Sequence, residues 1–169
     1  MTSILIIYTG GTIGMIENPE TGALENFDMD QFRHHVPELK RFNFNIDAIT
    51  FESPIDSSDM EPHYWVKIAK MIDENYDRYN GFVVLHGTDT MAYTAAALSY
   101  MIQNSSKPIV ITGSQKPINM DITDAKTNLL DSFIYAADEK SQGVVIVFDG
   151  KVIQGTRAKK TKTKSKTII

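Results

Sequence analysis

Two motifs in this sequence place threonine beside glycine where a nucleophile could act. They are residues 8–14 (YTGGTIG) and residues 85–91 (LHGTDTM). Each follows an apolar run typical of a buried strand, so Thr12 and Thr88 stand where a strand gives way to a loop or a helix. A threonine hydroxyl is a poor nucleophile until a base removes its proton, and Asp89 directly follows the second threonine. The pattern therefore predicts nucleophilic catalysis by one of the two threonines.

Each motif also has a purely structural interpretation. Gly10 and Gly11 suit a tight turn after a strand, and their spacing does not match the G-x-G-x-x-G nucleotide fingerprint. Thr88 or Asp89 can cap a helix by accepting hydrogen bonds from its first N–H groups. Capping and catalysis are compatible, because a helix N-terminus also favours a developing negative charge.

The hydrophobic pattern alternates between short apolar runs and longer segments of helical periodicity. It predicts strands at residues 3–8, 42–51, 82–85, 108–112 and 143–148, and helices at 28–35, 62–76, 89–103 and 123–137. Asp149 and Gly150 signal a hairpin turn into a last strand at 151–155, and the turn-rich residues 13–27 indicate a mobile loop. This order predicts an α/β fold, a doubly wound, mostly parallel sheet with helices on both faces and a C-terminal β-hairpin.

Two further polar loops follow predicted strands. Residues 56–59 (DSSD) come after the second strand, and residues 112–115 (TGSQ) close the fourth. Asp59 could instead cap the helix that follows it. Because ligands of such folds bind outside the carboxyl ends of the strands, we expect Ser57 to meet the two threonines and Asp89 in one crevice.

Composition narrows the class of protein. The chain has 169 residues, of which 42% are hydrophobic and 22% charged, as expected for one globular domain. It contains no cysteine, which excludes disulfides and thiolate chemistry. Its apolar runs are too short to cross a bilayer, and its start lacks a signal-peptide pattern, so we expect a cytoplasmic protein without a membrane partner.

Charge is distributed unevenly along the chain. The net charge is −4, but five lysines and no acid follow Arg157. Without those lysines the chain has 12 basic and 21 acidic residues, a net charge of −9, which disfavours binding to nucleic acid. The basic end is most simply a solvated tail. The four histidines do not form a metal-ligand cluster, and we expect neither a metal nor another cofactor.

The motifs at residues 8–14 and 85–91 resemble those of the bacterial type I (cytoplasmic) L-asparaginases, and the resemblance runs from the first strand to about Lys160. It implies hydrolysis of L-asparagine, a small-molecule substrate, to L-aspartate and ammonia. Thr12 is then the nucleophile that forms an acyl-enzyme, while Thr88, Asp89 and Lys160 form the proton relay. A lysine can act as proton acceptor when burial lowers its pKa. Lys159 is one position away from the matching register.

The same resemblance assigns a substrate-binding role to two loops and to the turn before the nucleophile. Ser57 matches the principal ligand of the substrate α-carboxylate, with Ser58 close enough in sequence to be the alternative. The substrate-binding residues implied are Gly11, Asp56, Ser57, Ser58 and Ser114.

Family enzymes have about twice this length, and their smaller second domain contributes to sites formed between subunits. We therefore expect residues 1–157 to be the nucleophile-bearing amino-terminal domain and 158–169 a basic tail. We expect a truncated form of a homo-oligomer whose activity is impaired. Because chain ends fray, we also expect Lys160 to be displaced from its working position. The loop at residues 21–24 (TGAL) also lacks the tyrosine that family members often place there.

Two other functions remain open at this stage. One is the asparaginase-like component of a tRNA-dependent amidotransferase, against which the acidic body of the chain weighs. The other is a non-catalytic remnant that binds aspartate or asparagine. Measuring ammonia release beside amino-acid binding separates these possibilities.

Overall fold

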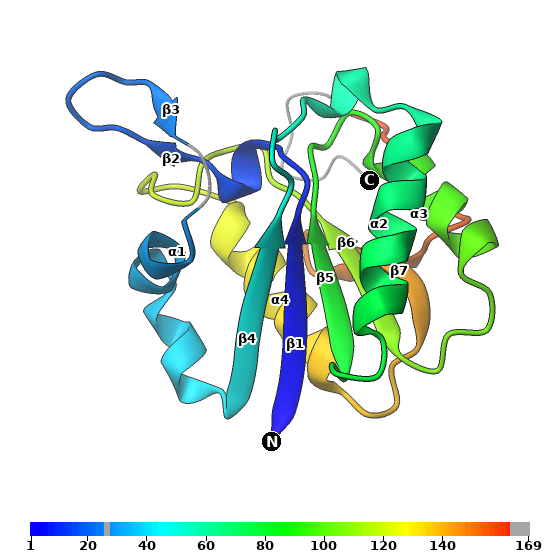
Figure 1. Ribbon diagram of the computed structural model, residues 1–169. Helices are drawn as coiled ribbons and strands as arrows, with labels where there is room; N and C mark the ends of the chain where they lie inside the picture. Colours follow the sequence, from blue (N-terminus) through cyan, green and yellow to red (C-terminus); the bar gives the residue numbers. More distant parts are fainter. Residues whose placement is uncertain (26–27, 163–169) are drawn as a thin grey trace.

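A computed structural model describes residues 1–25 and 28–162 of the chain. Its centre is a six-stranded sheet of order β4-β1-β5-β6-β7-β8, in which every neighbouring pair is parallel except β7 with β8 (Figure 1). The bounds are β1 Thr2–Tyr8, β4 Phe44–Thr50, β5 Gly81–Leu85, β6 Pro108–Thr112, β7 Gly143–Phe148 and β8 Lys151–Gln154. The predicted α/β fold with a C-terminal hairpin is confirmed.

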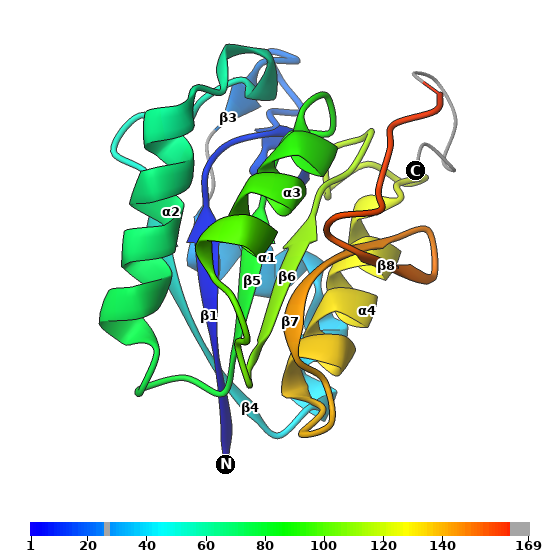
Figure 2. The same cartoon turned by 90° about the vertical axis from the view of Figure 1, so that its right-hand side faces the viewer.

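Helices cover both faces of this sheet (Figure 2). One apolar cluster joins one side of the strands to α1 and α4, and a second joins the other side to α2 and α3. Every residue of β5 and of β6 is buried, which is why these strands read as continuous apolar runs rather than alternating ones. The helix bounds are α1 Met29–His35, α2 Pro62–Asn75, α3 Met91–Met101 and α4 Ala125–Ala137.

The strand order reverses direction beside β1. The chain leaves β1 for β4 at one edge of the sheet and then crosses back to β5 on the other side of β1. At such a reversal the connections leave on opposite faces and open a crevice above the carboxyl ends of the two strands. Thr12 follows β1 and Thr88 follows β5, so the topology carries both threonines to this crevice.

Local sequence signals explain how several elements begin and turn. The Asp28 carboxylate accepts hydrogen bonds from the N–H groups of Asp30 and Gln31 and so caps α1. Asp149 and Gly150 both have positive φ, 50° and 70°, as a two-residue hairpin turn between β7 and β8 requires.

Residues 13–25 hold more regular structure than the turn-rich sequence predicts. A short 3₁₀ helix, Thr12–Gly14, leads into a small hairpin of β2 (Ile16–Glu17) and β3 (Leu24–Glu25). Asn119 anchors the hairpin, since its side chain accepts from the Glu17 N–H and donates to the Glu17 carbonyl. Residues 26–27 of the predicted loop lie outside the described residues. Within residues 1–25 and 28–162, no helix is long and apolar enough to cross a membrane.

Candidate active site

A cleft of about 450 Å³ opens at the carboxyl edge of the sheet and collects the residues of all four polar segments. It brings Thr12, Thr88 and Asp89 together with Ser57 and Ser114, which confirms the predicted convergence. The segments meet because each follows the end of a neighbouring parallel strand. The lining residues are Gly11, Thr12, Met15, Leu24, Pro54, Ile55, Asp56, Ser57, Gly87, Thr88, Asp89, Ser114, Gln115 and Lys160.

Two glycines allow the loops to approach this closely. Gly11 has φ +87°, and a Cβ built on it would lie 2.5 Å from the Gly87 nitrogen. A Cβ on Gly87 would in turn lie 2.5 Å from the Ser57 hydroxyl oxygen. Any other residue at either position would push the loops apart.

A buried tyrosine also holds the turn at Gly11, because the Tyr8 hydroxyl donates to the Gly11 carbonyl at 3.2 Å. Burial raises the pKa of Tyr8 to about 12, so it stays a neutral donor.

Ser57 is the buried member of the serine pair and is built into the second motif. Its Oγ accepts the Asp89 N–H at 3.2 Å, and its carbonyl accepts the Thr90 hydroxyl at 2.6 Å. The neighbouring Ser58 is exposed, does not line the cleft, and donates its hydroxyl to the Asp56 carboxylate at 2.7 Å. The backbone N–H of Ser58, and then its hydroxyl, hold the pKa of Asp56 below its ordinary value. Asp56 is therefore an anion at neutral pH.

Lys160 reaches the second motif from the far end of the described chain. Its Nζ lies 2.5 Å from Asp89 Oδ1 and 3.3 Å from the Thr88 hydroxyl oxygen. The expectation that fraying displaces Lys160 is therefore wrong. The physical reason is that Ala158 packs on the apolar cluster shared with α2 and α3, and the Arg157 N–H donates to the Gln154 carbonyl. The part of the predicted tail beyond residue 162 lies outside the described residues.

Gln115 is a cleft residue that the sequence analysis missed. Its Nε2 donates to the Thr88 hydroxyl oxygen at 3.2 Å, beside the Lys160 ammonium. The sequence signal that could have identified Gln115 is its position in the 112–115 turn, directly after Ser114. Ser114 also lines the cleft, and its hydroxyl donates to the Lys116 carbonyl. The apolar residues that line the cleft from the hairpin and from residues 54–55 were also missed, because no motif marks them in the sequence.

A buried chain of hydrogen bonds fixes the peptide that precedes Thr88. The Gly87 carbonyl accepts from Nδ1 of His86 at 2.6 Å, so Nδ1 carries the proton. Nε2 of His86 then accepts from the Thr94 hydroxyl at 2.8 Å, and that hydroxyl accepts from Trp65 at 3.0 Å. Complete burial lowers the pKa of His86 to about 4, which keeps the imidazole neutral. His86 thus orients the loop, because the Gly87 carbonyl and the Thr94 hydroxyl occupy both of its ring nitrogens.

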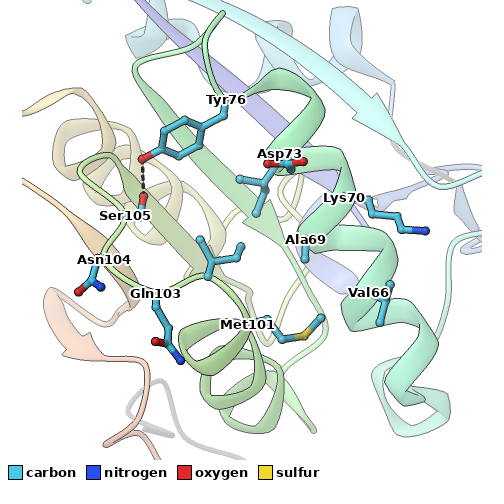
Figure 3. Close-up of a pocket in the computed structure, with 11 residues that line it drawn as sticks. Val66, Ala69, Lys70, Asp73, Tyr76, Met101, Gln103, Asn104 and Ser105 are labelled. Atoms are coloured by element: carbon cyan, nitrogen blue, oxygen red, sulfur yellow. Dashed lines mark hydrogen bonds between the residues drawn. The ribbon is translucent and has the colours of Figure 1, made fainter.

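A larger hollow of about 580 Å³ lies between α2 and the end of α3, away from these motifs (Figure 3). Two polar groups at one end of this hollow are bonded to each other, since the Tyr76 hydroxyl and Ser105 Oγ form a hydrogen bond of 2.8 Å. Residues of neither threonine motif line it, so the smaller cleft is the candidate active site. Among the described residues, no group of three or more histidine or acidic side chains could hold a metal ion.

Comparison with known proteins agrees with this geometry. Residues 3–168 match the family model described as "Asparaginase, N-terminal". The chain is similar to L-asparaginase 1 of Escherichia coli (strain K12), with 41% identity over 163 residues that cover 94% of this chain and 47% of that protein. It is also similar to a glutamyl-tRNA(Gln) amidotransferase component of Sulfolobus acidocaldarius, with 40% identity over 152 residues that cover 89% of this chain and 34% of that protein.

The solved structures show the same relationship. The crystal structure of L-asparaginase I from Vibrio cholerae superposes with a TM-score of 0.86 at 39% identity, over 96% of this chain and 49% of that one. The chain thus spans about half the length of the E. coli and Vibrio proteins. From the family match, the fold and the four converging segments, we conclude that the chain belongs to the asparaginase family and corresponds to its amino-terminal domain.

Proposed function

We propose that this cleft hydrolyses L-asparagine to L-aspartate and ammonia through an acyl-enzyme formed on Thr12. The observation that supports this most is the contact of Lys160 with both Asp89 and Thr88 in the cleft that Thr12 lines. A hydroxyl nucleophile needs such a proton relay, and a capping role for Thr88 and Asp89 does not require a lysine there.

In the proposed acylation, the Thr12 oxygen attacks the carbon of the side-chain amide. The hydroxyl proton passes to the relay of Thr88, Asp89 and Lys160, and the relay then protonates the departing nitrogen. Ammonia leaves, and an ester joins the substrate acyl group to Thr12. Backbone N–H groups near Gly11 and Thr88 hold the oxyanion, and one such donor is worth about 3 kcal/mol.

In the proposed deacylation, Thr88 and the relay activate a water molecule that attacks the ester. The acyl carbon gains the water oxygen, Thr12 recovers its proton, and L-aspartate is released. Both half-reactions use the same relay in opposite directions, as acid–base catalysis of a two-step hydrolysis requires.

Substrate recognition follows from the charges that line the cleft. The hydroxyl of Ser57 already accepts the Asp89 N–H, so its own hydrogen is available to the α-carboxylate of the substrate. The second oxygen of Asp89, together with the anionic Asp56, suits the α-ammonium group. The resemblance assigns the carboxamide to main-chain groups at Ser114. A free amino acid fits this pattern better than an amide within a peptide.

The remaining parts of the proposal concern the whole protein. We assign residues 1–157 to the nucleophile-bearing domain and 158–169 to a basic tail whose first residues, through Lys160, complete the site. We also propose a cytoplasmic homo-oligomer, as the type I resemblance implies, without a nucleic-acid or membrane partner and without a cofactor.

A second candidate function is glutamine hydrolysis in an amidotransferase, supported by the similarity to the Sulfolobus protein. Steady-state ammonia release from L-asparagine and from L-glutamine separates the two, with Thr12→Ala as the control. Because the chain spans about half the length of its relatives, we expect slow release from asparagine, which Thr12→Ala abolishes. Release from glutamine alone would favour the amidotransferase role. Tight binding of aspartate by calorimetry with no ammonia from either amide would favour the non-catalytic remnant.

A further inference from the structure

Side chains at the start of α4 and just before it hold the turn at residues 113–116, where the Thr123 hydroxyl donates to the Lys116 carbonyl at 3.2 Å. Both carboxylate oxygens of Asp124 accept the Gln115 N–H, at 2.9 and 3.1 Å, and one of them also accepts the Lys116 N–H at 3.2 Å. Asn128 donates from Nδ2 to the Gly113 carbonyl at 2.9 Å. Asp124 and Asn128 are only 9% and 1% exposed as residues, so these bonds are shielded from water. The backbone of the turn is therefore fixed from one side by α4.

Asp124 does not use its carboxylate as an ordinary helix cap. It occupies the N-cap position of α4 but makes no side-chain bond to the N–H groups of its own helix. The Thr123 hydroxyl accepts the Ala125 N–H at 3.0 Å in its place. An acidic residue at a helix start normally bonds to the second or third N–H of that helix. Here it reaches back across the chain to Gln115 and Lys116, so stabilising α4 does not explain its orientation.

The consequence of this arrangement appears at Thr88. The Gln115 backbone is pinned by Asp124, and its side chain donates to the Thr88 hydroxyl at 3.2 Å. Lys160 donates to the same oxygen at 3.3 Å. A threonine hydroxyl accepts two hydrogen bonds, so these donors fill both positions and leave its proton to be given to another group. Two donors on one oxygen also stabilise negative charge that develops on it.

We propose that Asp124 is a positioning residue that acts through the 113–116 turn on Gln115 and so on the Thr88 hydroxyl. The inference rests on the proposed function of the relay, which needs Thr88 held in one orientation. The groups of the proposed chemistry tolerate little displacement, since a shift of about 1 Å costs ~100-fold in rate. Without the carboxylate, the turn loses the acceptor for two N–H groups and the Gln115 side chain moves away from Thr88.

The kinetic test is a double-mutant cycle between Asp124→Asn and Gln115→Leu. The Thr123 hydroxyl, and not the Asp124 carboxylate, accepts an N–H at the start of α4, so the substitution removes the charge and one acceptor oxygen while keeping that start. We expect each single variant to lower kcat by between about 10- and 100-fold with little change in KM, and the double variant to be no worse than the more impaired single one. The matched control is Asp138→Asn at the opposite end of α4, where an exposed carboxylate accepts the Lys140 N–H. It should retain the activity of the unchanged chain.

An independent readout is the side-chain amide signal of Gln115 in a ¹⁵N correlation spectrum, assigned by its loss in Gln115→Leu. We expect Asp124→Asn to shift that signal and the Thr88 amide, and Asp138→Asn to move neither. Additive losses in the cycle, or an unmoved Gln115 signal, would overturn the inference. Should Asp124→Asn not fold, Asp124→Glu, which keeps the charge but displaces it, is judged by the same criteria. If the unchanged chain releases no ammonia, the proposed function fails, whereas the spectra still decide whether Asp124 positions Gln115.

Discussion

The Nζ of Lys160 lies 2.5 Å from Oδ1 of Asp89, although 71 residues separate the two in sequence. The lysine side chain is 17% exposed and the carboxylate 59% exposed, so the ion pair sits at the mouth of the cleft. An exposed surface pair of this kind adds little to stability. Its value lies in placing the Lys160 nitrogen beside Thr88, where the proposed reaction needs a group that accepts a proton and then returns it.

Replacing Lys160 should remove that carrier and leave the fold intact. We expect Lys160→Met to lower kcat by roughly 100- to 10,000-fold, the usual contribution of a general acid–base group. KM should change much less, because the proposed contacts to the substrate's charged groups come from Ser57, Asp56 and Asp89 and not from this lysine. Lys159→Met is the matched control, since Lys159 is exposed and does not line the cleft. A loss of kcat in Lys159→Met with an active Lys160→Met would show that the assigned lysine is wrong by one position.

The two adjacent serines should behave differently in substrate binding. Ser57 lines the cleft and Ser58 does not. Because a hydrogen bond to a charged group is worth about 1.5–3 kcal/mol, we expect Ser57→Ala to raise KM by roughly 10- to 100-fold. Ser58→Ala should leave KM within about twofold. Steady-state kinetics with L-asparagine checks both, and an increase in KM confined to Ser58→Ala would reverse the assignment.

The turn before Thr12 should not tolerate a side chain. At Gly11, alanine would combine a strained backbone at φ +87° with a contact of 2.5 Å to the Gly87 nitrogen. Strain of this kind costs about 1–3 kcal/mol before the clash is counted. At Gly22, φ is +68° but no atom lies within 4 Å of the added Cβ, so the cost is about 1–2 kcal/mol. Urea unfolding should therefore find Gly11→Ala the less stable variant, and equal losses would contradict the close packing of the loops.

The fold was predictable because its strands are buried on both faces. The runs at residues 3–8, 82–85 and 108–112 are continuous apolar stretches, and each is a central strand of the sheet. The hairpin at residues 16–25 was missed because its strands have only two residues each and it is anchored from outside, through Asn119. The periodicity of hydrophobic residues gives no information about a contact between segments that lie far apart in the sequence.

The site was predictable to the extent that motifs mark it. Thr12, Thr88 and Asp89 stand at strand ends, so the α/β pattern was enough to place them together. Gln115 and Asp124 were missed for a physical reason, since their roles depend on hydrogen bonds that form only when α4 packs beside the 113–116 turn. The displacement expected for Lys160 was wrong because the packing of Ala158 holds the chain in place.

The buried His86 should make stability depend on pH. Its pKa in the folded state is about 4, below the ordinary 6.5 of the unfolded chain. Between pH 4 and pH 6.5 the unfolded state binds a proton on this histidine and the folded state does not. The part of the free energy of unfolding that depends on His86 is therefore fully present above pH 6.5 and is lost as the pH falls towards 4. We expect about 2 kcal/mol of it to disappear between pH 7 and pH 5.

Urea unfolding of the unchanged chain and of His86→Gln at both pH values isolates this contribution. The free energy of unfolding of His86→Gln should fall less on acidification, by about that amount, because glutamine does not titrate. An identical pH dependence of the two proteins would show that His86 is not held neutral.

Mass spectrometry of the protein quenched during turnover tests most directly whether Thr12 is the nucleophile. The chain is mixed with L-asparagine, acid-quenched and mapped by peptide fragmentation, beside Thr12→Ala and Thr88→Ala. We predict an added aspartyl group on Thr12 that forms more slowly in Thr88→Ala, because both half-reactions use Thr88, and that is absent from Thr12→Ala. An aspartyl group on Thr88, or ammonia release that persists in Thr12→Ala, would contradict the proposed acyl-enzyme.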